Sequence, residues 1–292
     1  DAKEIETLCR PDSADYPHIA IYYYIQFNLH LQLLAATEHA RANGVVLKGD
    51  IPIGISRNSV EAWKEPHYFN LNGQAGAPPD DFSVNGQNWG FPTYNWDVME
   101  KDGYAWWMER IQANLTMYDV LRIDHFRGLE SYYAIPYGDA TAQNGHWCKG
   151  PGMDFIRAIR STVGDAPIIA EDLGMLTPAV HRLLKNSGYP GMKVLQFAFN
   201  ASEESTYLPH NLPNHCVVYT GTHDNDTTRG WLDCASPEDL EFAMEYLGLE
   251  DLKEGNWAFI RAALSSVADL AIVPFQDYLD LGSEARINTP ST

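Results

Sequence analysis

Three acidic side chains stand where short apolar runs end, and their chemistry is the most informative feature of the chain. Asp124 closes YDVLRID, Glu171 lies near the end of APIIAED, and Asp224 closes HCVVYTGTHD. An ionised, positioned carboxylate can act as a nucleophile, whereas a carboxyl group emerging from an apolar run can stay protonated and act as a general acid. Two carboxyl groups with these opposite demands form the pair that glycosidic chemistry uses.

The alternation of side chains along a strand assigns two faces to the run YDVLRID. Val120, Arg122 and Asp124 share one face, and Leu121 and Ile123 share the other. We expect the apolar pair to be buried. We expect the guanidinium of Arg122 to lie beside Asp124 and to favour its ionised form.

Glu171 and Asp224 have different neighbours in the sequence. Glu171 shares its side of the strand with Ile169 and has no Lys or Arg beside it, so we expect it to remain protonated. Asp224 directly follows His223. Taken singly, an Arg–Asp or His–Asp pair at a strand end can be a structural ion pair. Three carboxylates at the same end of three strands favour an active site.

Other kinds of site fit these residues less well. Asp and His at a strand end could ligate a metal ion, but no second histidines cluster with the acids. A serine hydrolase of the nucleophile-elbow type needs a G-x-S-x-G motif, which the sequence does not contain. The HDND stretch lacks the D-x-D-x-D-G spacing of a calcium loop. We therefore expect neither a metal ion nor a cofactor here.

Six apolar runs, most of them ending in polar or acidic residues, predict parallel strands buried on both faces. They are GVVLKGD (44–50), YDVLRID (118–124), APIIAED (166–172), GMKVLQFAF (191–199), HCVVYTGTHD (215–224) and DLAIVPFQD (269–277). Helical spacing separates most of these runs, over residues 103–117, 152–163, 178–187 and 237–247.

This alternation of strands and helices indicates a parallel α/β fold. Because polar residues follow the carboxyl ends of the strands, we favour a (β/α)8 TIM-type barrel, whose chemistry lies at that face. A doubly wound sheet is the alternative, but no Gly-rich phosphate loop follows any of the runs. No repeat or linker marks a boundary, so we expect residues 1–292 to form a single catalytic barrel region.

One long interval, residues 52–117, is expected to be an insertion between two barrel strands. Within it, residues 56–98 are predicted to form a long loop. Loops of this length are usually functional. Its rings could form a small aromatic core, or some could face a ligand, and with the neighbouring Asn, Gln and Asp they suit a carbohydrate better than a phosphate ester. The aromatic residues are Trp63, Tyr68, Phe69, Phe82, Trp89, Phe91, Tyr94 and Trp96.

Charge and composition exclude several partners and compartments. With 39 acidic and 20 basic residues, the net charge of −19 offers no positive surface for a nucleic acid or an anionic membrane. Cys9, Cys148, Cys216 and Cys234 lie far apart, with no C-x-x-C pair, and are expected to be reduced thiols. There is no secretory leader and no apolar stretch of about 20 residues, so we expect a cytoplasmic protein.

These motifs occur together in one known family. RIDHFRG, IIAEDLG, YTGTHDNDTTRGW and GSEARINTP, in this order, resemble the 4-α-glucanotransferases, also called amylomaltases or disproportionating enzymes. GDIPIG and AGAPPDDFSVNGQNWGFPTYNW resemble earlier segments of the same family. The resemblance implies a (β/α)8 barrel that performs retaining transglycosylation. Its expected partners are α-1,4-glucan donor and acceptor oligosaccharides.

The resemblance also implies a role for each candidate residue. Asp124 matches the nucleophile, Glu171 the acid/base, and Asp224 the third carboxylate, which holds ring hydroxyls and stabilises the transition state. In retaining enzymes the nucleophile and the acid/base lie about 5 to 5.5 Å apart, and we expect this separation here. Arg122 and His223 match partners of the reacting groups. The sugar contacts are expected to be Asp50, Gln87, Trp89 and Asn288.

The chain departs from the family in its length. Members of the family are longer, so the chain resembles a fragment that lacks both ends, with one or two barrel strands expected before Asp1 and a further stretch after NTPST. Since closure depends on all the strands, the barrel is expected to be incomplete at the N-terminus. Two other functions stay open. One is a retaining α-glucan hydrolase, in which water replaces the acceptor, and the other is a glucan-binding protein without turnover.

Overall fold

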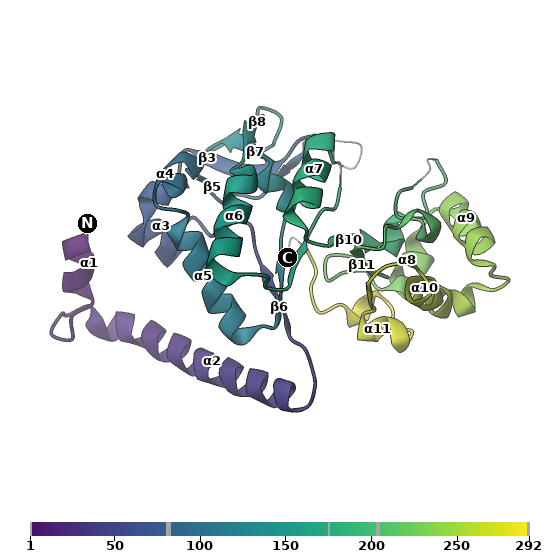
Figure 1. The fold of residues 1–292 in the computed structure, drawn as a ribbon, viewed down its shortest axis with the longest axis horizontal. Coiled ribbons are helices and arrows are strands. Elements are labelled where there is room, and N and C mark those ends of the chain that lie inside the picture. The colour runs from purple at the N-terminus through teal and green to yellow at the C-terminus, as the bar shows by residue number, and fades with distance from the viewer. Residues whose placement is uncertain (1, 80–82, 175, 203–204, 291–292) are drawn as a thin grey trace. The chain divides into compact units, whose positions relative to one another are not determined.

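The computed structural model describes residues 2–79, 83–174, 176–202 and 205–290 (Figure 1). Phe82, one of the aromatic residues of the expected insertion, lies outside these ranges. The chain divides into two compact units. The first comprises Asp1–Glu171 and Met175–Tyr189, and the second comprises Asp172–Gly174 and Pro190–Thr292.

A three-stranded parallel sheet forms the centre of the first unit. Its order is β1-β6-β9, and its strands are β1 (Lys48–Ile51), β6 (Val120–Ile123) and β9 (Ile168–Ala170). A strand lies at each of the three predicted places, and β6 and β9 are buried as predicted. The prediction for residues 44–50 is wrong in part, because β1 begins at Lys48, is exposed at every second residue, and follows the exposed Val45 and Val46. Leu121 and Ile123 are fully buried, as the alternation predicts. The register places Asp50 opposite Arg122, which sets the geometry of the site described below.

Three helices that lie side by side accompany this sheet, namely α5 (Ala105–Met117), α6 (Gly152–Val163) and α7 (Pro178–Ser187) (Figure 1). They confirm the predicted helices at 103–117, 152–163 and 178–187. The hydroxyl of Thr177 accepts the N–H of Val180 at the start of α7, where a proline also fits the first helical position. Trp107 and Phe155 join α5 to α6 in a core of edge-to-face rings.

The prediction that residues 56–98 form a loop is wrong in part. A second, antiparallel sheet of order β4-β3-β7-β8 uses two of its segments. The glycine at position 76 allows β3 and β4 to approach closely, because a Cβ there would lie 2.0 Å from the carbonyl oxygen of Gln87. The elements are α3 (Val60–Lys64), η1 (Pro66–Tyr68), β2 (Phe69–Asn70), β3 (Gly73–Ala77), β4 (Gln87–Asn88), β5 (Thr93–Tyr94), α4 (Trp96–Lys101), η2 (Phe126–Leu129), β7 (Ser131–Pro136) and β8 (His146–Lys149).

Two helices precede the first strand, α1 (Ala2–Leu8) and α2 (Tyr16–Ala42). Near its C-terminal end, α2 contacts the rest of the first unit through the hydroxyl of Thr37, which donates to the carbonyl of Met117, and through an Arg41–Asp119 ion pair. Its earlier turns expose many apolar side chains. Within the described ranges, no helix is both long enough and apolar enough to cross a membrane.

The second unit contains another three-stranded parallel sheet, of order β10-β11-β12. Its strands are β10 (Gly191–Val194), β11 (Cys216–Tyr219) and β12 (Leu270–Ile272), at the remaining three predicted places. Strand β11 is buried throughout as predicted, whereas β12 is not, since Leu270 is 48% exposed. Its helices are η3 (Leu195–Phe197), η4 (Pro209–Asn211), α8 (Thr228–Cys234), α9 (Pro237–Leu247), η5 (Leu252–Glu254), α10 (Gly255–Leu264), α11 (Phe275–Tyr278) and η6 (Ser283–Ala285). The predicted helix at 237–247 is α9, whose first turn is capped by Ser236.

Candidate active site

The buried guanidinium of Arg122 contacts two carboxylates in the first unit. Its Nη1 lies 2.7 and 2.8 Å from the two carboxylate oxygens of Asp50, and 3.1 Å from Oδ1 of Asp124. The predicted contact between Arg122 and Asp124 is therefore confirmed. The contact with Asp50 was not predicted. It arises because β1 and β6 pair in parallel with these two residues side by side.

The carboxylates determine the protonation behaviour of Arg122. Burial acts to lower the pKa of its guanidinium, but the nearby charges of Asp50, Asp124 and Glu171 outweigh that effect and raise the pKa above its ordinary value. A permanent positive charge thus lies among three acidic side chains at the ends of β1, β6 and β9. Such a cation offsets the repulsion between the carboxylates of Asp50 and Asp124.

Asp124 is fixed by the backbone as well as by Arg122. Its N–H donates to the carbonyl of Ile51, 3.1 Å away, which continues the pairing of β6 with β1. Its Oδ2 accepts the N–H of Ile53 at 3.4 Å. The main chain of Asp124 is therefore tied to the last residue of β1, and its side chain to the segment that follows β1.

Glu171 follows β9 directly and is nine-tenths buried. Its N–H donates to the carbonyl of Ile123, and its carbonyl accepts the N–H of Phe126, both at 2.9 Å. Its side-chain Oε2 accepts the backbone N–H of His125 at 2.7 Å. The residue after Asp124 thus holds the carboxyl group of Glu171, so the two candidate catalytic acids are linked through one residue.

His125 is a residue of the candidate site to which the sequence assigned no role. Its backbone is left-handed, with φ of 45°, which is uncommon outside glycine and is found where surrounding structure imposes it. Burial lowers the pKa of its imidazole to about 4, so the ring is neutral at physiological pH. No signal in the sequence reports the backbone angle. The His-Phe-Arg run after Asp124 was the available hint.

The ring of His125 contacts Trp89, with centroids 4.8 Å apart in an edge-to-face arrangement. Trp89 also stacks on Phe91. Its indole N–H donates to Oε1 of Gln87 at 3.0 Å, so these two predicted sugar contacts lie together. Because His125 follows Asp124 in the chain, this aromatic group adjoins the carboxylates.

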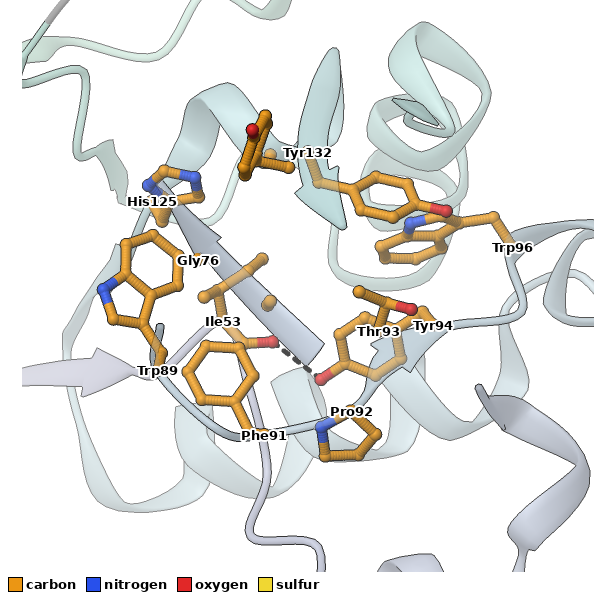
Figure 2. A pocket seen from close by; sticks show the side chains of 13 residues that line it. Ile53, Gly76, Trp89, Phe91, Pro92, Thr93, Tyr94, Trp96, His125 and Tyr132 are labelled. Carbon is orange, nitrogen blue, oxygen red and sulfur yellow. Dashed lines mark hydrogen bonds between the residues drawn. The ribbon is translucent and has the colours of Figure 1, made fainter. Parts of the chain in front are cut away.

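A pocket opens beside His125 and is lined mainly by aromatic rings (Figure 2). Figure 2 shows the rings of Trp89 and His125 at one side of it and those of Tyr94 and Trp96 at the other. The hydroxyl of Tyr94 donates to the carbonyl of Ile53 at 2.7 Å. Tyr94 and Trp96 are buried in the core of the first unit, whereas Trp89 remains partly exposed. The interpretation of the insertion as a small aromatic core is therefore confirmed for Tyr94 and Trp96.

The second unit holds the other three predicted residues next to one another. Nε2 of His223 lies 3.3 Å from Oδ2 of Asp224. The side-chain amide of Asn288 donates to the carbonyl of His223 at 3.0 Å and to Oδ1 of Asp224 at 3.3 Å. The structure thus gathers the predicted residues into two groups. One is in the second unit, and the other, in the first unit, comprises Asp50, Gln87, Trp89, Arg122, Asp124 and Glu171.

Comparison with known proteins agrees with the motifs. The family described as 4-alpha-glucanotransferase matches residues 1–292. The 4-alpha-glucanotransferase of Clostridium butyricum is 47% identical over 277 residues, which cover 92% of this chain and 57% of that protein. The enzyme of Thermus thermophilus is 43% identical over 301 residues, which cover 99% of this chain and 60% of that protein.

Solved structures give the same result. The amylomaltase from Streptococcus agalactiae, determined in complex with acarbose, superposes with a TM-score of 0.87 at 37% identity, covering 91% of this chain and 55% of that one. The amylomaltase from Corynebacterium glutamicum has a TM-score of 0.80 at 21% identity, covering 97% and 46%, and this supports the fold alone.

The fold is therefore that of the amylomaltases, a parallel α/β architecture with polar residues at its strand ends. The chain belongs to the 4-alpha-glucanotransferase family, since the family match extends over its whole length and the relatives exceed 40% identity. The resemblance carried by the motifs is confirmed. The chain spans 57 to 60% of the length of these two relatives.

Proposed function

We propose that the protein transfers segments of α-1,4-glucan between malto-oligosaccharides through a covalent glycosyl-enzyme intermediate. The observation that carries this proposal is the pairing of Asp124, held by Arg122, with Glu171, held by the N–H of His125. Membership of the 4-alpha-glucanotransferase family supports it. The acarbose complex of the Streptococcus agalactiae amylomaltase supports an oligosaccharide as ligand.

In this mechanism Asp124 is the nucleophile and Glu171 is the acid/base. Glu171 gives its proton to the glycosidic oxygen that leaves, while Asp124 forms a bond to the anomeric carbon. Glu171 then removes the proton of the acceptor's 4-hydroxyl, whose oxygen displaces Asp124. Arg122, whose Nη1 lies 3.1 Å from Oδ1 of Asp124, holds that side chain in place before the attack and after its release. We expect the two carboxyl groups to lie about 5 to 5.5 Å apart.

The remaining residues are assigned to substrate binding. We propose that Asp224 holds ring hydroxyls and stabilises positive charge at the transition state, with His223 and Asn288 beside it. In the first unit, Trp89 offers a partly exposed ring for stacking on a sugar, with Gln87 as its hydrogen-bonded neighbour. Asp50, although bonded to Arg122, keeps enough exposure to accept a sugar hydroxyl.

We further propose that the two parallel sheets are parts of one (β/α)8 barrel, into which residues 52–117 are inserted. The support is that each sheet is parallel and that polar residues follow β6, β9 and β11. A crystal structure of the protein tests this directly. Strands β9 and β10 lying too far apart in that crystal structure to be neighbours around one barrel would refute it.

Partners and location follow from composition. The net charge of −19 supports neutral glucans as donor and acceptor, with neither nucleic acid nor membrane as a partner. The four cysteines are free thiols, which suits a cytoplasmic location.

Incubation with maltotriose tests the proposed reaction. Chromatography of the products should show a ladder of both shorter and longer oligosaccharides, and Asp124→Asn should abolish it. The matched control Asp165→Asn, in an exposed turn before β9, should retain full activity. New reducing ends without longer products would indicate a hydrolase instead. Unchanged glucan binding by both variants, with no products from the parent protein, would indicate a binding protein.

A further inference from the structure

We propose that Asp277 is a positioning residue that fixes the loop carrying His223 and Asp224. This inference rests on the proposed role of Asp224. Asp277 lies in α11, far along the chain from that loop, and is 1% exposed. None of the motifs in the sequence assigns it a role.

The carboxylate of Asp277 accepts hydrogen bonds from two threonines. Its Oδ2 lies 2.5 Å from the hydroxyl of Thr220 and 2.8 Å from the hydroxyl of Thr228. Its Oδ1 accepts the backbone N–H of Thr228 at 2.8 Å. Both threonines are fully buried, so water does not compete for these bonds.

The two threonines stand at opposite ends of the loop 221–227. Thr220 directly follows β11, and Thr228 is the first residue of α8. One carboxylate therefore ties together the point where the strand ends and the point where the helix begins. The path of the intervening residues is restricted by this closure.

Contacts inside the loop carry this restriction to Asp224. Oδ1 of Asn225 accepts the N–H of Thr222 at 2.9 Å and its hydroxyl at 2.8 Å, which forms a compact turn. The N–H of Asp224 donates to the same hydroxyl at 3.3 Å. The side chain of Asp224 is 55% exposed, so burial alone does not orient it. Its direction depends on the path of the loop and on the contacts of its carboxylate with His223 and Asn288.

The chemistry of the site requires a carboxylate. Two hydroxyls and one amide N–H all donate, so both oxygens of residue 277 must accept. An asparagine has the same shape but directs an NH2 group at one of these donors, and a buried donor then loses its acceptor. The main chain of Asp277 is held separately, because the amide of Asn256 donates to its carbonyl at 3.2 Å. Asp277→Asn therefore perturbs the loop closure specifically.

The test compares Asp277→Asn and Thr220→Val with Ala243→Gly, a destabilising control in the buried face of α9. In maltotriose disproportionation, Asp277→Asn should lower kcat about 100-fold, as expected for a misplaced catalytic group. Its KM should stay within about threefold of the parent value, because the lost interaction acts in the transition state. Ala243→Gly should lower the melting temperature and leave kcat at room temperature unchanged.

A double variant separates positioning from general damage. If Thr220 acts through Asp277, adding Thr220→Val to Asp277→Asn should change kcat by less than about twofold, although Thr220→Val alone lowers it. If Asp277→Asn has the same melting temperature as Ala243→Gly but keeps the parent kcat, the proposal is overturned. Should Asp277→Asn fail to fold, Thr220→Val alone decides, and an unchanged kcat in that variant also overturns it.

Amide hydrogen exchange provides a readout that does not depend on turnover. The amides of 221–227 should exchange faster in Thr220→Val than in Ala243→Gly, and equal rates would refute the loop closure. Asp224→Asn distinguishes the proposed function from this inference. If Asp224→Asn keeps full activity, the role of Asp224 fails and this inference with it. If Asp224→Asn is inactive while Asp277→Asn is fully active, only the inference fails.

Discussion

Replacing Arg122 by leucine should destabilise the first unit more than any change to an exposed ion pair. The side chain is 5% exposed, and one of its nitrogens contacts two carboxylates, those of Asp50 in β1 and of Asp124 directly after β6. Leucine would fill part of the space and leave both carboxylates without their cation. The cost is therefore the uncompensated negative charge, in addition to the lost hydrogen bonds.

The size of the expected loss of stability depends on how far the two carboxylates are exposed to water. Removing one partner of a buried ion pair costs about 3 to 5 kcal/mol. The side chains of Asp50 and Asp124 are 38% and 34% exposed, so water screens part of the repulsion that remains. We therefore expect about 3 kcal/mol, the lower end of the range. At about 2 to 4 °C per kcal/mol for a domain of this size, the melting temperature should fall by roughly 6 to 12 °C.

Differential scanning calorimetry at neutral pH measures this loss. The matched control is Arg157→Leu, which removes an exposed ion pair with Asp154 on α6 and should cost less than about 1 kcal/mol. Combining Arg122→Leu with Asp50→Asn should restore part of the stability, because it removes one of the two negative charges that Arg122 contacts. If Arg122→Leu melts within about 2 °C of Arg157→Leu, the electrostatic reasoning is wrong.

Two further predictions concern pH and packing. Burial lowers the pKa of His125 from 6.5 to about 4, so between these pH values the unfolded chain binds a proton that the folded chain does not. The free energy of unfolding should therefore be highest above pH 6.5 and should fall by on the order of 3 kcal/mol towards pH 4. His125→Asn, which tolerates a left-handed backbone, should flatten that decline in urea unfolding, and an unchanged pH profile would contradict it. Gly49→Ala would place a Cβ 2.3 Å from the ring of Tyr118, so it should cost about 1 to 3 kcal/mol by displacing β1 or that ring, as urea unfolding would show. If the urea midpoint of Gly49→Ala equals that of the parent protein, the ring of Tyr118 moves aside without cost, and the prediction is wrong.

The sequence predicted those strands and helices that have a recognisable pattern in their own residues. All six strands were located because each overlaps a run rich in apolar residues, although β1 itself is Lys-Gly-Asp-Ile. The helices α7 and α9 were recognisable because a Thr-Pro or Ser-Pro pair marks their starts. The strand β3 was missed, since Gly-Gln-Ala-Gly-Ala contains no β-branched or aromatic residue. It is a strand because β7 and β4 pair with it.

The sequence indicated which side chains belong to the candidate site, but it predicted fewer of the contacts between them. Alternation along β6 was enough to place Arg122 beside Asp124. The pairing of Arg122 with Asp50 depends on the register of two strands separated by a long insertion, which one sequence does not reveal. The hydrogen bond from His125 to Glu171 depends on a positive φ angle and on a backbone group, neither of which has a side-chain signature.

The aromatic core of the first unit has a consequence for spectroscopy. Of the eight tryptophans, Trp231 and Trp257 belong to the second unit, which leaves six in the first, where several of them stack on other rings. Intrinsic fluorescence therefore reports chiefly on the first unit, whereas far-ultraviolet circular dichroism weights both units by their helix content. Unfolding curves from the two signals should be recorded together, because only their coincidence would justify treating the chain as a two-state system.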